Sequence, residues 1–236
     1  MNAAFSTMGG LNMLAFLIAA IFLPEAGQRK AAASPSPSLR EMSTSNTIKG
    51  IFSFRLAFSM GRGIFAAFMP IFAGTYIGLS PTFIGVLLAV NILLMSLLQI
   101  YGGHTADRFS RRAMVTIGGM INLAFLALIP SGGNFWQLLG ICALGSLGGA
   151  ISIPAASALV VEEGRRFGMG SAMAVFALAF SIGMAVGPLL SGVIADLVNI
   201  NSVFYFGAIM SLIGTCLLYT SPSPRDLSTS RMPSSA

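Results

Sequence analysis

Residues 103–112 read GHTADRFSRR and connect two long apolar runs, Phe83–Tyr101 and Ala113–Pro130. The segment places one acid, Asp107, and three arginines within ten positions. Two helices that leave a membrane on the same side need a short hydrated connection, because unpaired backbone groups are not tolerated in the hydrocarbon. We therefore predict that this segment is a loop between two membrane-spanning helices.

The composition of the whole chain agrees with a membrane protein. Hydrophobic residues make up 55% of the sequence and charged residues 8%, whereas a soluble domain carries about a quarter charged residues. The net charge of +6 comes from basic residues at the ends of apolar runs, which indicates topology signals rather than a nucleic-acid surface. Both cysteines, Cys142 and Cys216, lie inside apolar runs, so we expect no disulfide, metal site or cofactor.

Six apolar runs follow position 50, and each is close to or longer than a span. A hydrocarbon core is about 30 Å thick, and a helix rises about 1.5 Å per residue. We expect an all-α integral membrane protein with a six-helix bundle over residues 51–216. The runs are Ile51–Tyr76, Phe83–Tyr101, Ala113–Pro130, Trp136–Val161, Met169–Ala195 and Val203–Tyr219.

The two segments before the bundle differ from each other. Residues 1–24 are strongly apolar only from Leu11 to Leu23, and we interpret them as a partial transmembrane helix. A signal peptide and an unusual first helix are the alternatives, although the segment lacks a basic start and a small-residue cleavage site. Residues 25–50 contain basic residues and the run SPSPS, which predicts a flexible cytoplasmic linker.

Basic and uncharged or acidic connections alternate along the chain. Arginine or lysine occurs in residues 25–50, 102–112 and 162–168, and neither occurs in residues 77–82, 131–135 and 196–202. The positive-inside rule requires this alternation of consecutive spans. It places the basic connections and the C-terminus in the cytoplasm, and we expect the plasma (inner) membrane of a prokaryote.

The loop resembles a motif of the major facilitator superfamily, Gly-x-x-x-Asp-(Arg/Lys)-x-Gly-Arg-(Arg/Lys). The matching residues are Gly103, Asp107, Arg108, Arg111 and Arg112, and Ser110 stands where the family prefers glycine. A second match resembles the Gly/Pro motif of antiporter members: Gly183, Gly187, Pro188 and Gly192, with Ala174 and Ser191 in place of two glycines. Both motifs fall at the helix numbers that the family pattern requires.

The resemblance implies roles for these two motifs. Asp107, at the head of a helix, can accept bonds from backbone N–H groups, and the arginines can pair with it and with carbonyls at helix ends. The family uses this cluster as a cytoplasmic latch between access states; alternatively the arginines only set topology. The Gly/Pro helix bends during alternating access in the family, whereas close packing of small residues is the plainer interpretation.

The six runs can be either half of such a transporter. We favour the C-terminal half, in which residues 1–24 end helix six, residues 25–50 are the central loop and the N-terminal half is missing. The degraded loop motif and the absence of arginine from Trp136–Val161 support this assignment. As an N-terminal half, the chain would leave residues 1–24 without a counterpart.

Residues 217–236 form a tail that resembles translated sequencing-adapter read-through, and an ordinary tail is the alternative. If the tail is non-native, the last helix is cut short near Cys216. Resequencing of the locus should then give different codons from about residue 219, whereas a genomic read through Tyr219–Ala236 would contradict this prediction.

Arg62 is the most informative candidate site residue. It lies near the middle of its run, where an arginine costs about 2.5–3.5 kcal/mol on insertion scales. Arg55 lies seven residues earlier on the same helical face and can reach the cytoplasmic interface. Either Arg62 lines a central cavity, binding an anion or pairing with a carboxylate, or it only bonds neighbouring carbonyls.

Three amides complete the candidate pathway. Asn91 and Gln99 share one face of their run, and Asn122 lies in the next run. Each can line the pathway or hydrogen-bond between helices. No run has an acid deep inside it, so a coupling proton or ion would need a group outside this sequence.

These features predict a secondary transporter that moves a small molecule by alternating access, with efflux preferred. Its partners are the lipid bilayer, the substrate, a coupling proton or ion and the missing half, with no nucleic acid. The alternative is a non-transporting scaffold or sensor built from the same helices. An enzyme is not expected, because the spans contain no Ser/His pair, histidine cluster or carboxylate pair.

Overall fold

The computed structural model describes residues 2–22 and 45–221. The described residues are helical and contain no strand, which confirms the all-α prediction. The chain divides into two units, residues 1–36 and 37–236, and each is considered by itself. The first unit contains α1, Asn2–Phe22, while most of the predicted linker and tail lies outside the described residues.

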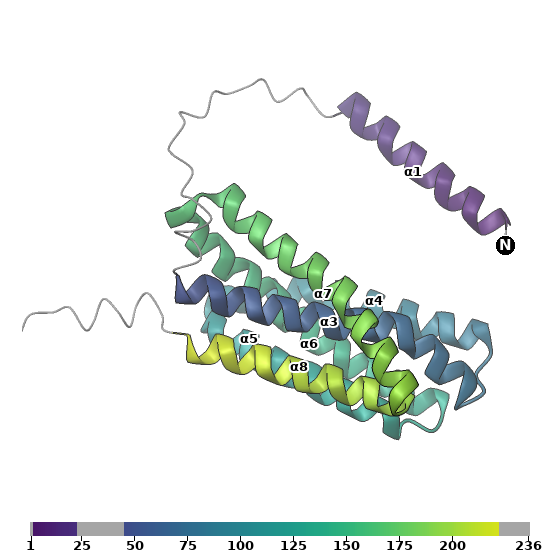
Figure 1. Ribbon diagram of the computed structural model, residues 1–236. Helices are drawn as coiled ribbons and strands as arrows, with labels where there is room; N and C mark the ends of the chain where they lie inside the picture. The colour runs from purple at the N-terminus through teal and green to yellow at the C-terminus, as the bar shows by residue number, and fades with distance from the viewer. Residues whose placement is uncertain (1, 23–44, 222–236) are drawn as a thin grey trace, which may run out of the picture. The chain divides into compact units, whose positions relative to one another are not determined.

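Six helices of the second unit are long and apolar enough to cross a membrane, which confirms the predicted spans. Figure 1 shows them lying along one bundle. Their bounds are Asn46–Thr75 for α3, Pro81–Arg108 for α4, Arg111–Leu128 for α5, Phe135–Phe167 for α6, Met169–Leu197 for α7 and Ile200–Thr220 for α8, with a short 3-10 turn η1 at Ile129–Ser131.

Side-chain caps fix where several of these helices begin. Ser45 accepts a hydrogen bond from the backbone N–H of Ile48, and Asn134 and Asn199 cap α6 and α8 in the same way. Such caps satisfy N–H groups that the first helical turn leaves unpaired. Gly168 alone separates α6 from α7, and its φ of 89° is a conformation that favours glycine.

The helices extend further than the apolar runs predicted. Residues 46–50 belong to α3 rather than to the linker, and α8 continues past Cys216 to Thr220. The predicted loop 103–112 is largely wrong, because α4 runs through Arg108 and only Phe109 and Ser110 separate it from α5. A helix can continue past its apolar run because charged side chains on its last turns reach the hydrated interface.

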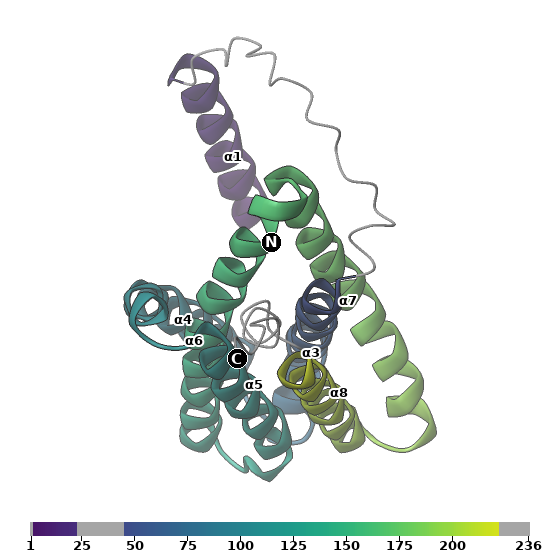
Figure 2. The same cartoon turned by 90° about the vertical axis from the view of Figure 1, so that its left-hand side faces the viewer.

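Most of the extensive contacts in the bundle join helices that are not consecutive in the sequence. Helix α3 packs against both α7 and α8, α6 packs against both α4 and α5, and α5 and α8 join the two groups. Figure 2 views the bundle along its helices and shows these two groups on opposite sides. The starts of α3 and α5 and the ends of α6 and α8 lie together, and we call this the basic end.

Glycines set the close approach of α3 and α7. A Cβ at Gly187 would lie 2.6 Å from the Met60 carbonyl oxygen, and one at Gly183 would lie 2.5 Å from the Leu56 carbonyl oxygen. A Cβ at Gly192, further along α7, would meet no described atom outside its own stretch of helix within 4 Å. The packing interpretation therefore accounts for Gly183 and Gly187 but not for Gly192.

This difference predicts opposite effects of the same substitution on one helix. Gly187→Ala should destabilise the bundle by about 1–3 kcal/mol, the usual range for an overpacked interface, and lower its thermal midpoint in detergent. Gly192→Ala is the matched control and should leave the midpoint unchanged or slightly raised, because alanine favours helix. Equal midpoints for the two variants would contradict the packing role of Gly187.

Candidate functional site

A cavity with a volume of about 460 Å³ lies among α3, α4, α6 and α7. That volume is within the range of about 300–1,000 Å³ that is typical of small-molecule sites. Its wall is mainly apolar, with a few polar groups. The lining residues that carry the argument below are Arg55, Phe58, Arg62, Asn91, Gln99 and Phe180.

Arg62 is held by a buried hydrogen-bond network. Its Nη1 donates to Oδ1 of Asn91 over 3.1 Å, and Nδ2 of Asn91 donates to the Cys142 carbonyl at 2.8 Å and to Oγ of Ser146 at 3.0 Å. Asn91 and Ser146 are both fully buried. The Asn91 amide is therefore fixed by its NH2 group against α6, and its oxygen points toward the arginine.

Arg55 also lines the cavity, on the same face of α3 as Arg62, as their spacing of seven residues indicates. Its guanidinium lies 4.5 Å from the centre of the Phe176 ring and 4.7 Å from that of Phe180, both on α7. Such cation–π contacts stabilise an arginine in a site with little water. In the structure this contact takes the place of the expected reach of Arg55 to the interface. The sequence signal for the contact was a pair of aromatic residues, Phe176 and Phe180, spaced four apart on one helix.

The three amides separate into two places. Gln99 lines the cavity together with Asn91, as their shared helical face predicts. Asn122 is buried between α5 and α8, where its Nδ2 donates to Oγ of Ser211 over 3.1 Å. Asn122 is absent from the described cavity wall and forms the interhelical bond that was the alternative prediction.

Two arginines of the loop motif, Arg111 and Arg112, lie at the basic end. Arg111 forms an exposed salt bridge of 3.1 Å with Glu162 at the end of α6, and Arg112 donates to the Ser221 carbonyl beyond α8. The second contact agrees with the expected pairing to a helix-end carbonyl. An exposed salt bridge contributes only about 0.2–1 kcal/mol, so these contacts hold the helix ends without dominating stability.

The other members of the loop motif are described only in part. Gly103 and Asp107 belong to the last turns of α4, so the prediction that Asp107 begins a helix is wrong. An acid in that place is not favoured by the dipole of its own helix. The side chains of Asp107 and Arg108 lie outside the described residues.

Pro188 of the Gly/Pro motif packs against α3. As a proline it cannot donate to the Met184 carbonyl, and a Cβ at Gly63 would lie 3.0 Å from both that oxygen and the Pro188 ring. Glycine at position 63 therefore gives room for the altered turn of α7. This arrangement is compatible with a bend, and it fixes where the bend would occur.

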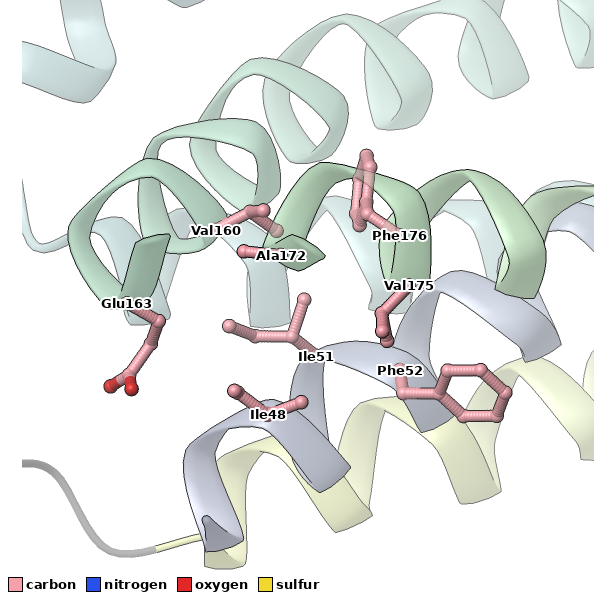
Figure 3. Close-up of a pocket in the computed structure, with 8 residues that line it drawn as sticks. All are labelled: Ile48, Ile51, Phe52, Val160, Glu163, Ala172, Val175 and Phe176. Carbon is pink, nitrogen blue, oxygen red and sulfur yellow. The ribbon is translucent and has the colours of Figure 1, made fainter. Parts of the chain in front are cut away.

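A second, much smaller cavity lies near the basic end, between α3, α6 and α7. Its volume of about 10 Å³ has room for about one water. Figure 3 shows apolar side chains around it, with the carboxyl group of Glu163 at the edge. The cavity is a packing defect rather than a second site for an organic molecule.

Comparison with known proteins identifies the family. The family model "Major Facilitator Superfamily" matches residues 51–234, more than half of the chain, and the chain belongs to this superfamily. It is a multi-pass integral membrane protein, as expected for the inner membrane of a prokaryote. The match continues across most of residues 217–236, so it gives no support to a non-native tail.

Three similar proteins illustrate the relationship. An uncharacterized MFS-type transporter of Methanocaldococcus jannaschii is 28% identical over 66% of this chain and 40% of its own length. The multidrug resistance protein MdtG of Dickeya zeae is 32% identical over 58% of this chain and 33% of its own, and MdtH of Yersinia enterocolitica is 28% identical over 58% and 34%. The chain thus spans about a third to two-fifths of these relatives.

The place of Asn122 outside the cavity leads to a prediction. Ser211→Ala removes the acceptor of the Asn122 amide and should lower stability by about 1 kcal/mol, the scale of such bonds within membranes. Ligand binding in the cavity should stay unchanged, which equilibrium binding in nanodiscs can measure. A change in affinity without a change in thermal midpoint would place Asn122 in the pathway after all.

Proposed function

We propose that this protein moves a small molecule across the membrane by alternating access, in the efflux direction. The observation that carries the proposal is the cavity between α3, α4, α6 and α7, with Arg62 fixed in its wall. Membership of a transporter superfamily and similarity to two multidrug resistance proteins support it. An apolar wall with few polar groups suits small organic molecules better than ions.

The chain acts, on this proposal, as one six-helix half, and we keep its assignment as the C-terminal half. Rocking of two halves about a midplane site would expose the cavity to each side in turn. The contacts of Arg111 and Arg112 at the basic end would favour one access state, and α7 would bend near Pro188. A coupling proton or ion would act through a group in the other half.

Arg62 provides the test of this proposal. Cells should express the locus with its upstream coding sequence, and export of a dye panel should be measured at matched membrane levels. Arg62→Ala should reduce export at least about tenfold, because it removes the fixed charged group from the wall, and Arg62→Lys should retain part of the activity. Lys49→Ala removes the positive charge of an exposed side chain near the start of the same helix and should have no effect.

Two results would contradict the proposal in different ways. Wild-type export by both Arg62 variants would remove Arg62 from the mechanism. Failure of the wild-type protein to move any dye would favour the non-transporting scaffold or sensor.

A further inference from the structure

The cavity wall carries two positively charged side chains and, among the described residues, no negatively charged one. Arg55 and Arg62 are its charged lining residues, and none of the described residues in its wall is acidic. The acids whose side chains the structure describes, Glu162, Glu163 and Asp196, lie outside this wall. Two positive charges at membrane depth are costly unless a partner of opposite charge is available.

Arg62 is positioned to offer further hydrogen-bond donors. A guanidinium has five N–H donors in a planar fork, and within the described residues the structure gives Arg62 one hydrogen bond, to Asn91. Because Asn91 is itself held by Cys142 and Ser146, the fork has a fixed anchor. A planar fork of this kind matches the two oxygens of a carboxylate or sulfonate.

Arg55 adds positive charge two helical turns away. Its contacts with the rings of Phe176 and Phe180 fix the guanidinium, and its Nε is buried without a hydrogen-bond partner among the residues that the structure describes. The rest of the wall offers flat or polarizable surface from Phe58, Phe65 and Met184. An apolar body can rest on these side chains while its charged group faces the arginines.

We propose that this cavity selects organic anions: molecules with one carboxylate or sulfonate on an aromatic body, whose charged group binds Arg62. This inference rests on the proposed function, because it names the substrate class of the same cavity. Asn91 acts as the positioning residue of Arg62, and Arg55 raises the positive potential along the same wall.

A pair of matched probes tests the selectivity directly. The protein expressed from the locus with its upstream coding sequence, in nanodiscs of zwitterionic lipid, is titrated separately with 8-anilino-1-naphthalenesulfonate and with N-phenyl-1-naphthylamine, which share one aromatic body and differ in the sulfonate. Fluorescence of empty nanodiscs is subtracted. Arg62→Gln should weaken binding of the sulfonate at least about tenfold and change binding of the neutral probe less than about twofold.

Control variants separate this effect from general damage. Lys49→Gln removes the positive charge of an exposed side chain near the start of α3 and should leave both affinities unchanged. Arg62→Lys should lie between the wild type and Arg62→Gln for the sulfonate, because it keeps the charge and loses the fork. The inference would be overturned if Arg62→Gln lost affinity for both probes equally while the variant protein eluted from size-exclusion chromatography at the position of the wild type.

A competition experiment needs no variant. On the wild-type protein, naphthalene-2-carboxylate should displace the sulfonate probe at a concentration at least about tenfold lower than naphthalene-2-carboxamide, which has nearly the same shape. Equal potency would overturn the inference. If anionic phosphatidylglycerol in the nanodisc abolishes probe binding, the cavity takes a lipid headgroup, and the proposed class of diffusible anions is wrong.

The outcomes distinguish this inference from the proposed function. Anion-selective binding with no export of any dye would support the inference and contradict transport. Export of neutral or cationic dyes, with no preference for the carboxylate in competition, would support transport and overturn the inference.

Discussion

Close approach of helix backbones at small residues is the constraint on which this bundle depends. Lipid is as apolar as the side chains that face it, so burial of apolar surface does little to draw spanning helices together. Contact at short range then has to supply the attraction. At the α3–α7 interface, glycines at 183 and 187 bring one backbone against Leu56 and Met60 of the other. Gly118 and Gly148 have the same relation between α5 and α6.

This close packing of the helices also determines the shape and chemistry of the cavity. Helix α3 is drawn toward α7 and α8, and α4 is drawn toward α6, so a space remains between α3 and α4. Polar groups that are buried beside this space need partners within the protein, because a buried polar group without a hydrogen bond is costly. Asn91 donates to the Cys142 carbonyl on α6 and accepts a hydrogen bond from Arg62, while Arg55 is held by rings of α7.

Much of this could be read in the sequence, and some of it could not. Six spans, their alternating direction and the shared face of Asn91 and Gln99 follow from apolar periodicity and helix geometry. The extent of the loop at 103–112 was mispredicted because hydropathy marks where lipid ends, not where a helix ends. The place of Asn122 was open because periodicity identifies a face but not the helix that packs against it.

By itself, the sequence determined a membrane protein of six spans, its family and an arginine at membrane depth. Charged groups and unpaired backbone groups are costly in hydrocarbon, so the spans must be long, apolar and helical, and these properties can be recognised from the order of the residues. Tertiary structure decided which helices are neighbours, and with that the partners of each polar group. Arg62 meets Asn91 across 29 positions and Asn91 meets Ser146 across 55. Arg55 shares the helical face of Arg62 by its spacing, but the two rings that hold its guanidinium lie on α7, and contacts between such distant segments depend on packing that no local pattern records.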